Sequence, residues 1–481
     1  MEQTSSRTIR QGMCVRNWIN ANGYGTVNAI MGFGKTRIAK IISDGAIKKN
    51  PSKDIIAIAP NRITTDNLIK NLSHLVLSYS ATEFSNILKM PSRYDDCQFV
   101  IIDEIHKFFT PEREKILEYF SEKDCKRLGL TGSTLSSEMK TKLAHYGFPV
   151  IDVITEEEAI NNEWISPYRE YNLAIPFPDD LKEEYANFTE KISKLRVKYK
   201  GVIQSYVYKG KPLFDNVDSM LRACLAGIKV ESNYVNYNLI CDSIAAKKGY
   251  TSKLRATNAY TKMIIDEWSP SRIHQDGKTY NNLVRERYNL ISCNSVKLDT
   301  VVNIIKNNDV PTIVFNDSTL LAEKIGEALG NRAIVWHSSL EPKPYKDPDN
   351  EEYYCFKHGG IRLIGKDALR KIATEGMLSG KYKYLICVKA MNEGLDIPLL
   401  QQVITTAGDT NVMSYEQRIA RGKRLDKDNE KKVCTIINCY HPNFMLNDKT
   451  VISRDYQKLM ERQTESAHNI IWIDSVDEII I

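Results

Sequence analysis

The sequence contains no hydrophobic run that approaches the roughly 18 residues needed to cross a membrane. Its ten cysteines are scattered, and none of them forms a Cys-x-x-Cys pair. Cys434 and Cys439 flank a short apolar run, which is typical of core packing. The cysteine pattern therefore argues against a disulfide framework and a zinc site. Residues 1–20 lack the pattern of a signal peptide, so we expect a protein of the cytoplasm, or of the host cytoplasm if it is viral.

An excess of charge of one sign is also missing. The 66 lysines and arginines nearly balance the 60 aspartates and glutamates, which leaves a net charge of +6 over 481 residues. This mild basic excess tolerates a polyanionic partner without requiring one. The hydrophobic content of 42% is that of an ordinary globular protein. The chain is too long for one core, so its length predicts two or three domains.

A glycine-rich stretch, Ala29-Ile-Met-Gly-Phe-Gly-Lys-Thr36, lies between a β-prone run and a helix-prone segment. Gly32 and Gly34 allow the backbone to approach an anion closely, and the helix start supplies N–H groups that point at it. The pattern predicts that Lys35 reaches the β- and γ-phosphates of a nucleotide and that Thr36 holds Mg²⁺. The alternative is a turn of small residues with an incidental Gly-Lys-Thr.

Between residue 26 and about residue 155, short apolar strands alternate with amphipathic helices, which predicts a parallel sheet covered on both sides. The expected strands are Thr26–Ala29, Ile55–Ala59, Phe99–Ile102, Arg127–Leu130 and Val150–Val153. In such sheets the carboxyl ends of the strands line the binding crevice. Gln11, upstream of the first strand, could read an adenine base, and an ordinary exposed glutamine is the alternative.

The apolar strand Phe99–Ile102 delivers Asp103 and Glu104 to its carboxyl end. Two adjacent carboxylates are costly there unless a cation or a water molecule uses them. We interpret Asp103 as a Mg²⁺ ligand and Glu104 as the residue that orients and deprotonates an attacking water. His106 could form a hydrogen bond across the crevice. The alternative is that these polar residues only mark the boundary between a strand and a loop.

Two further polar stretches follow predicted strands. Thr131 and Ser133 lie in Leu130-Thr-Gly-Ser133, and we interpret them as relays between the nucleotide and the rest of the protein, with an ordinary turn as the alternative. Pro60 cannot continue a strand ladder, so Asn61 and Arg62 should turn out at the crevice edge. There Arg62 could meet a nucleic-acid phosphate.

A second α/β series begins near residue 311. Its expected strands are Thr312–Phe315, Ala333–Trp336, Tyr384–Val388, Gln402–Thr405 and Val433–Ile437, and its expected helices are Leu320–Leu329 and Lys366–Ser379. The series contains no second phosphate loop, so one nucleotide is expected per chain. A tight turn at Gly394 would place Asp396 near a ribose or near the seam between two lobes.

The stretch Tyr415-Glu-Gln-Arg-Ile-Ala-Arg-Gly-Lys-Arg424 places Gln417, Arg421 and Arg424 at helical spacing, so we expect them on one face of a helix. A row of arginines without acids on the same face favours an external anion. We interpret Arg421 and Arg424 as arginine fingers on a γ-phosphate. A solvated basic helix is the alternative.

Together these motifs resemble those of the superfamily 2 helicases. The similar stretches are Ala29–Thr36, Asp103–His106 (Asp-Glu-Ile-His), Leu130–Ser133, Glu393–Pro398 (Glu-Gly-Leu-Asp-Ile-Pro) and Gln417–Arg424. Within the superfamily they look like the DExH group that includes phage and bacterial branched-DNA helicases and restriction-enzyme motor subunits. The resemblance covers roughly residues 10–165 and 300–440. Ala420 stands where the family carries glycine.

The resemblance implies an α/β fold with two RecA-like parallel-sheet lobes and a mainly helical insertion. The lobes would close on Mg²⁺ and ATP, hydrolyse the ATP, and step along a nucleic acid. Two surfaces would bind the nucleic-acid strand. One is built from residues 60–62, and the other from Asn316–Ser318, in which Asn316 and Ser318 are the expected contacts. The expected division is 1–165 for the first lobe, 166–300 for a linker strand and the insertion, 301–445 for the second lobe, and 446–481 for a C-terminal extension. The strand-like Tyr168–Ile175 would already belong to the second lobe.

Basic and tyrosine-rich segments mark the expected insertion. From Lys191 to Pro212 there are seven basic residues and no acid, with Tyr199, Tyr206 and Tyr208 interleaved. A similar segment spans residues 244–262. Lysines and arginines neutralise phosphates and tyrosine rings stack on bases, so contact with nucleic acid is the favoured interpretation, and a helical spacer is the alternative. The apolar and acidic C-terminal end would either cap a sheet edge or dock on a protein partner.

DNA is the favoured substrate, because the loop at 393–398 and the arginine motif look more like those of the DNA motors. The alternatives are a DExH-type RNA helicase, a double-stranded DNA translocase that does not separate strands, and a nucleotide-gated scaffold with weak hydrolysis. A monomer is plausible, and protein partners would bind through the insertion or the tail. No nuclease or methylase motif is visible in the sequence.

Overall fold

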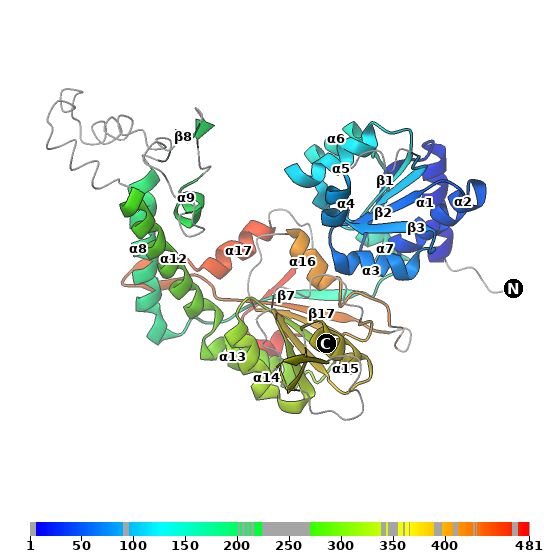
Figure 1. The fold of residues 1–481 in the computed structure, drawn as a ribbon. Helices are drawn as coiled ribbons and strands as arrows, with labels where there is room; N and C mark the ends of the chain where they lie inside the picture. Colours follow the sequence, from blue (N-terminus) through cyan, green and yellow to red (C-terminus); the bar gives the residue numbers. More distant parts are fainter. Residues whose placement is uncertain are drawn as a thin grey trace, which may run out of the picture. The chain divides into compact units, whose positions relative to one another are not determined.

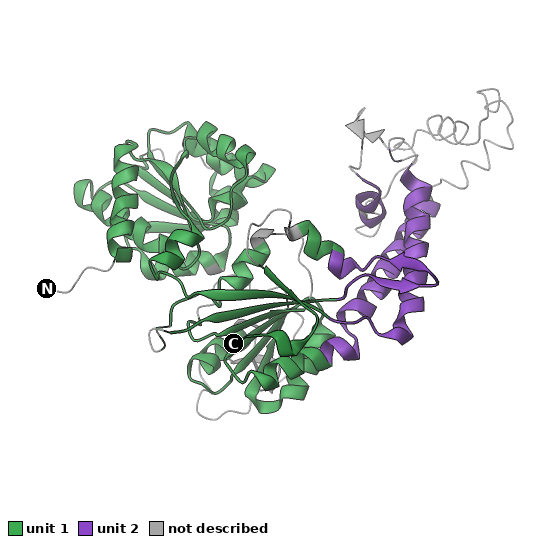
Figure 2. Cartoon of the chain, turned by 180° about the vertical axis from the view of Figure 1, so that it is seen from behind, with its two compact units in different colours: residues 1–174, 299–440, 457–481 green, residues 175–298, 441–456 purple. Residues whose placement is uncertain are grey.

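The structure is a computed structural model, and it forms two compact units (Figure 2). It describes residues 6–89, 96–200, 203, 207–208, 211–212, 216–223, 270–337, 343–344, 355–358, 361–364, 366–388, 397–406, 412–426, 429, 431–463 and 470–480. The first unit comprises residues 1–174, 299–440 and 457–481, and the second comprises 175–298 and 441–456. Over the described residues, no helix is long and apolar enough to span a bilayer.

The first lobe, within the first unit, is built on a six-stranded parallel sheet (Figure 1). Its strands are β1 (Tyr24–Ala29), β2 (Ile55–Ala59), β3 (Val76–Ser80), β4 (Phe99–Ile102), β5 (Lys126–Thr131) and β6 (Val150–Ile154). They lie side by side in the order β3-β2-β4-β5-β1-β6. The sequence predicted every strand of this sheet except β3. Only the two end residues of β3 are buried, so this edge strand has no continuous apolar run.

Helices cover both faces of this sheet. They are α1 (Ser6–Asn20), α2 (Lys35–Lys49), α3 (Arg62–Asn71), α4 (Ala81–Ile87), α5 (Pro111–Ser121), α6 (Ser137–His145) and α7 (Glu156–Asn161). Alternate residues of β4 face opposite ways: Ile101 packs into the core beneath α1 and α2, and Ile102 into the core beneath α4 and α5. The strand is buried at every position, as its unbroken apolar run predicts.

The second lobe, also within the first unit, has a seven-stranded sheet in the order β11-β15-β10-β16-β17-β7-β20. Its strands are β7 (Tyr168–Ala174), β10 (Thr312–Asn316), β11 (Ala333–Trp336), β15 (Tyr384–Val388), β16 (Gln402–Thr405), β17 (Cys434–Tyr440) and β20 (Ile470–Ile473). Its helices include α13 (Ser295–Asn307), α14 (Thr319–Leu329), α15 (Lys366–Leu378), α16 (Val412–Ile419) and α17 (Arg454–Gln463). A separate three-stranded sheet contains β12 (Lys343–Pro344), β13 (Cys355–His358) and β14 (Ile361–Ile364).

Two strands join this sheet from distant parts of the chain. β7 precedes the insertion and pairs in parallel with β17, from Tyr168 opposite Cys434 to Ala174 opposite Tyr440. β20 comes from the C-terminal end and pairs in parallel with the other side of β7. Of the two expectations for this end, a capped sheet edge is the one that the pairing of β20 supports.

The described residues of the second compact unit are mainly helical. It contains α8 (Asp179–Lys200), α9 (Val217–Ala223), α12 (Pro270–Ser292) and the hairpins β8 (Val207–Tyr208) with β9 (Lys211–Pro212) and β18 (Phe444–Leu446) with β19 (Lys449–Val451). Buried tyrosines fill its interior, among them Tyr185, Tyr199 and Tyr280. Lys297 and Asp455 form a fully buried ion pair of 2.6 Å within the same unit. The segment at 244–262 lies outside the described residues.

One expected helix is shorter than the sequence predicted. Helix α16 ends at Ile419, and residues 420–423 form a turn, so Arg421 and Arg424 do not continue one helical face with Gln417. The physical reason lies at Gly422. A Cβ at this position would overlap Cys434 Sγ and lie 2.7 Å from Val403 Cγ2, so the backbone packs directly on β16 and β17. This close approach favours a turn over a further helical turn with side chains.

Candidate active site

The phosphate loop connects β1 to α2. Gly32 and Gly34 both have positive φ values, 87° and 99°, which glycine adopts without strain. Gly34 is the N-cap of α2, and no side chain caps the helix there. The first N–H groups of this 15-residue helix therefore receive no acceptor from an N-cap side chain, which is the arrangement that binds phosphate in nucleotide-binding loops.

Lys35 and Thr36 begin α2, which follows the phosphate loop beyond the carboxyl end of β1. The Nζ of Lys35 donates to the carbonyl oxygen of Ala29 at 3.3 Å. A Cβ at Gly132 would overlap Lys35 Nζ, so this glycine leaves room for the lysine. Burial acts to raise the pKa of both the Asp103 and the Glu104 carboxyl, and the charge of Lys35 acts against that effect at each of them. The structure thus brings three of the predicted motifs together around one ammonium group.

Two residues of α1 hold the phosphate loop by its carbonyl oxygens. Gln11 is 2% exposed, and its Nε2 donates to Phe33 O at 2.8 Å. Its Oε1 is buried, and no described residue forms a hydrogen bond with it. Arg7, one helical turn earlier, donates from Nε to Phe33 O at 2.8 Å and from Nη2 to Gly32 O. Arg7 belongs to none of the predicted motifs, and its spacing of four residues from Gln11 is the only local signal of its role.

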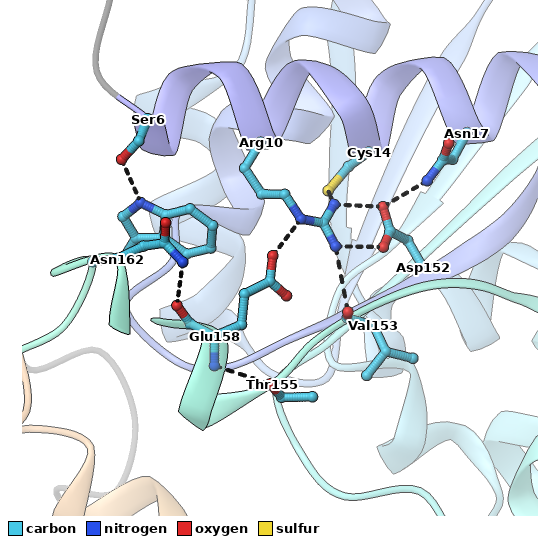
Figure 3. Close-up of polar contacts among 10 residues, drawn as sticks. Ser6, Arg10, Cys14, Asn17, Asp152, Val153, Thr155, Glu158 and Asn162 are labelled. Atoms are coloured by element: carbon cyan, nitrogen blue, oxygen red, sulfur yellow. Dashed lines mark hydrogen bonds and ion pairs between the residues drawn. The ribbon is translucent and has the colours of Figure 1, made fainter. Parts of the chain in front are cut away.

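A network of charged groups fixes α1 to the edge of the sheet (Figure 3). Arg10 forms a two-pronged contact with Asp152, at 2.9 Å and 2.8 Å, and its Nε donates to Glu158 on α7 at 2.7 Å. Asn17 donates to the same Asp152 carboxylate at 2.9 Å. These hydrogen bonds, with burial acting against them, raise the pKa of Arg10 above its ordinary value. The helix that contacts the phosphate loop is therefore anchored by permanently charged hydrogen bonds.

Asp103 and Glu104 form a pair of adjacent, buried carboxyls after β4. Burial and the neighbouring Glu104 charge raise the pKa of Asp103 to about 7. Burial acts on Glu104 in the same direction, but the charges of Lys35, His106 and Lys107 outweigh it and lower the pKa of Glu104. A divalent cation beside Asp103 would remove the cost of ionising it. The Asp103 carboxyl is therefore suited to binding a cation, and the Glu104 carboxyl stays ionised without one.

The backbone at Glu104 takes the left-handed conformation, with φ 48° and ψ 48°. It turns the chain into the short 3-10 helix η2 (Ile105–Phe108), which buries His106. The imidazole Nδ1 lies 2.8 Å from Thr131 Oγ1 and 3.4 Å from Glu104 Oε2, and Nε2 lies 3.4 Å from Ser133 Oγ. The predicted coupling residues His106, Thr131 and Ser133 are thus in mutual contact, and they adjoin the acidic pair.

The arginine motif lies in the second lobe, in and beyond α16. Gln417 and Arg421 are 5% and 8% exposed, so both side chains are largely withdrawn from solvent. Burial lowers the pKa of Arg424. The neighbouring Arg418 is also buried, lies 4.0 Å from Asp317, and stacks over Phe315. Gly394 and Asp396 lie outside the described residues.

The residues predicted to touch nucleic acid have local structural roles. Asn61 caps α3 by accepting from Thr64 N, and Ser318 caps α14 by accepting from Leu321 N. Arg62 is exposed and pairs with Glu83 at 2.5 Å, and the carbonyl of Pro60 accepts from Arg113 at 3.1 Å. Asn316 is fully buried and accepts from Thr406 at 2.6 Å, so its amide packs inside the lobe instead of facing solvent.

The basic face expected in the insertion is partly neutralised by the protein itself. Arg196 forms a two-pronged contact with Asp218, and Lys198 contacts Asp276 at 2.7 Å. Tyr199 is fully buried and donates to the same Asp276 carboxylate at 2.9 Å. This tyrosine therefore does not stack on a base, which corrects its predicted role. Lys191 remains exposed.

Comparisons with known proteins agree with this architecture. Residues 296–426 match the model of the helicase conserved C-terminal domain. The chain is similar to Dbp5 of S. cerevisiae bound to RNA and ADP BeF3, with 10% identity, a TM-score of 0.52, and coverage of 99% of this chain and 91% of that chain. It is also similar to a fragment of a putative HsdR subunit of a type I restriction enzyme from Vibrio vulnificus YJ016, with 14% identity, a TM-score of 0.50, and coverage of 99% and 69%.

A search of curated proteins finds no match to the sequence. At these identities the structural likeness shows the fold. The chain therefore carries a helicase conserved C-terminal domain within the second of two RecA-like helicase lobes.

Proposed function

We propose that this protein is an ATP-dependent helicase or translocase that couples hydrolysis of Mg²⁺-bound ATP to movement along a nucleic acid. The observation that carries the proposal is the convergence of Lys35, Asp103 and Glu104 at one sheet edge, with His106 linking the acidic pair to Thr131 and Ser133. A phosphate loop alone would support any nucleotide-binding protein. The added acidic pair and histidine relay favour hydrolysis that is transmitted to another part of the molecule.

The residues present fit a nucleotide with its metal ion. The loop offers positive-φ glycines and uncapped helix N–H groups for phosphates. The unpartnered Oε1 of Gln11 is an acceptor suited to the amino group of adenine. Thr36 and Asp103 would hold Mg²⁺, which is usually bound by one or two protein groups together with phosphate oxygens. No cluster of three or more metal-ligating side chains occurs in the described part of the chain, which agrees with that mode.

Each residue has a defined chemical role in the proposal. Lys35 neutralises the β- and γ-phosphates, and Glu104 orients the attacking water and accepts its proton. Arg421 and Arg424 would stabilise the charge of the transition state, with Gln417 contacting the same phosphate. Arginine fingers of this type accelerate hydrolysis by about 10³- to 10⁵-fold. A cation held by Thr36 and Asp103 would offset negative charge on the phosphates.

DNA is the proposed substrate on the basis of the motif resemblance, and duplex or branched forms are both candidates. An RNA helicase is the second candidate, favoured by the similarity to Dbp5, whose structure contains RNA. A double-stranded DNA translocase that does not separate strands is the third. Strand displacement on matched DNA and RNA duplexes distinguishes the first two, and triplex displacement beside a forked-duplex assay identifies the third.

The primary test is a steady-state ATPase titration with single-stranded, duplex and branched DNA and RNA. We expect turnover to rise with one class of nucleic acid, and to fall by at least about 100-fold in Lys35→Ala, Glu104→Gln and Arg421→Ala. Turnover that persists in these variants would remove the proposed roles. Turnover that ignores every nucleic acid would favour a nucleotide-gated scaffold over a motor.

A further inference from the structure

Lys432 is a buried lysine whose ammonium group lies between two backbone carbonyl groups. The residue is 3% exposed. Its Nζ donates to Pro398 O at 2.6 Å and to Arg424 O at 2.6 Å. Among the described residues, no carboxylate forms an ion pair with it. The lysine therefore acts as a hydrogen-bond donor to the backbone instead of as a partner for an acid.

The two carbonyl groups belong to segments that the proposed function places beside the nucleotide. Arg424 follows the turn at 420–423, and Pro398 is the last residue of the sequence motif 393–398, of which the structure describes residues 397 and 398. The Arg424 carbonyl also accepts from Ser166 Oγ at 2.9 Å, and Ser166 N donates to Lys423 O at 2.8 Å. One ammonium group thus connects the arginine turn to Pro398. Ser166, in the segment before β7, forms two further hydrogen bonds with the same turn.

Stability is a poor explanation for this lysine. Burial lowers the pKa of Lys432 to about 8, and the charge of Arg424 acts in the same direction. A lysine whose pKa falls on folding costs folding free energy at neutral pH, because the folded protein disfavours the charged form. An apolar side chain would avoid that cost. What the ammonium group supplies is a pair of short, charge-assisted hydrogen bonds at a fixed separation.

We propose that Lys432 is a positioning residue that holds the arginine turn and the end of the 393–398 loop in register for nucleotide hydrolysis. The inference rests on the proposed roles of Arg421 and Arg424. It adds a residue outside the motifs, eight positions beyond Arg424, that acts through the backbone and does not touch the phosphate. Ser166 supports the same turn from the segment between the two lobes.

The charged and titratable groups around Lys432 define its expected pH dependence. Asp426 and the Cys434 thiol on β17 favour the charged amine, and Arg424 disfavours it. Below about pH 8 the group is an ammonium ion with three donors, and above that pH it becomes a neutral amine with weaker hydrogen bonds. We therefore expect kcat to decline as the pH rises through about 8.

The experiment compares Lys432→Met, Lys432→Arg and the exposed neighbour Lys431→Met in nucleic-acid-stimulated ATPase assays between about pH 6.5 and pH 9.5. We expect Lys432→Met to lower kcat by about 10- to 100-fold with a small change in KM for ATP, because misplaced catalytic groups cost rate more than binding. Lys432→Arg should restore most of kcat and lose the decline near pH 8, since arginine stays charged. Lys431→Met should match the wild type.

Two results would overturn the inference while leaving the proposed function intact. One is a kcat in folded Lys432→Met close to that of the wild type while Arg424→Ala is inactive. The other is a decline of kcat near pH 8 in Lys432→Arg that equals the decline in the wild type. This second result decides the question even if Lys432→Met does not fold. If Arg421→Ala and Arg424→Ala instead both kept the ATPase activity of the wild type, the proposed function would be wrong. The inference about Lys432 would then be wrong as well.

Discussion

Buried polar side chains determine what the first lobe can do at the scale of single residues. The sequence predicted that Asp103 and Glu104 follow a buried strand, because four apolar residues precede them. It did not predict the left-handed backbone at Glu104, which aims His106 at Thr131. That conformation depends on the packing of η2 and of β5 around it. The sequence therefore predicted which residue types lie at this site, but not the hydrogen bonds that they form.

Replacing His106 with alanine should uncouple hydrolysis from nucleic acid more than it slows basal hydrolysis. The imidazole links Glu104 to the side chains of Thr131 and Ser133, so its loss removes that side-chain link and leaves the phosphate loop intact. We expect the stimulation of ATPase by nucleic acid to fall by about 2- to 30-fold. The measurement is the ratio of stimulated to basal turnover.

His145→Ala is the matched control, because this histidine is exposed on α6. It should keep the full ratio. An unchanged ratio in His106→Ala would refute the coupling role of the histidine.

His441 should make the protein less stable in mild acid. Burial, with a smaller effect of Lys297, lowers the pKa of His441 to about 3. Its two ring nitrogens contact Ile175 O and Asn294 Nδ2, both at 2.8 Å. Since the folded pKa lies below the ordinary value of 6.5, the stabilising contribution is complete above pH 6.5 and is lost as the pH falls toward 3.

The expected slope from this residue is about 1.4 kcal/mol of unfolding free energy per pH unit below pH 6. The measurement is the melting temperature between about pH 4.5 and 6.5 for the wild type and His441→Gln, and the variant should show the weaker pH dependence. His74→Gln, at an exposed site, should behave as the wild type. Equal slopes for wild type and His441→Gln would contradict the assignment.

At the scale of elements, α1 shows how a helix outside the recognisable motifs positions a site. Its residues Arg7 and Gln11 contact the phosphate loop, and Arg10 joins it to β6 and α7. Helical spacing could have suggested that Arg7 and Gln11 share a face. The partners Asp152 and Glu158 lie more than 140 positions away, so no local pattern connects them to Arg10.

Arg10→Met should destabilise the first lobe and weaken nucleotide binding together. The substitution leaves the largely buried Asp152 carboxylate without its arginine, which costs about 3–5 kcal/mol in similar cases. Because α1 carries Gln11, we also expect a higher KM for ATP. Thermal unfolding and ATPase kinetics measure the two effects.

The control for Arg10→Met is Lys40→Met, which removes an exposed pair with Asp44 and should cost under about 0.5 kcal/mol. The double variant Arg10→Met with Asp152→Asn should recover part of the stability, since it removes the stranded charge as well. If Arg10→Met leaves the KM for ATP unchanged, the anchoring of α1 by Arg10 does not contribute to nucleotide binding.

At the scale of the whole molecule, the sequence shows two lobes and an insertion, and the structure assigns the strands that complete them. β7 and β20 belong to the second sheet although long stretches of chain separate them from β17 and from each other. The described part of the insertion is mainly helical, as expected, but some of its basic residues form ion pairs within the insertion itself. Charge counted along a sequence therefore overestimates the charge available to a partner.

Lys198→Met should lower the stability of the helical unit, whereas Lys191→Met should leave it unchanged. Lys198 is half-buried against Asp276, and Lys191 is exposed. We expect a loss of about 1 kcal/mol for Lys198→Met, or a melting temperature lower by about 2–4 °C. Calorimetry measures the stability, and nucleic-acid affinity at two salt concentrations measures the contact with phosphates.

Lys191→Met is the variant expected to lower the salt dependence of nucleic-acid binding, because its ammonium group is free to displace a counterion. A weakened affinity in Lys198→Met with no change in melting temperature would contradict the structural role of that lysine.

The sequence by itself determined the residue chemistry and the two α/β series, because apolar strands, glycine turns and adjacent carboxylates are local patterns. It also determined which strand ends carry polar side chains. Only the tertiary structure decided the contacts across the chain, which include the hold of Arg7 on the phosphate loop, the end of α16 at Ile419, and the bridge that Lys432 forms between two loops. These depend on burial and on close backbone approach between distant segments, and no local pattern encodes either one.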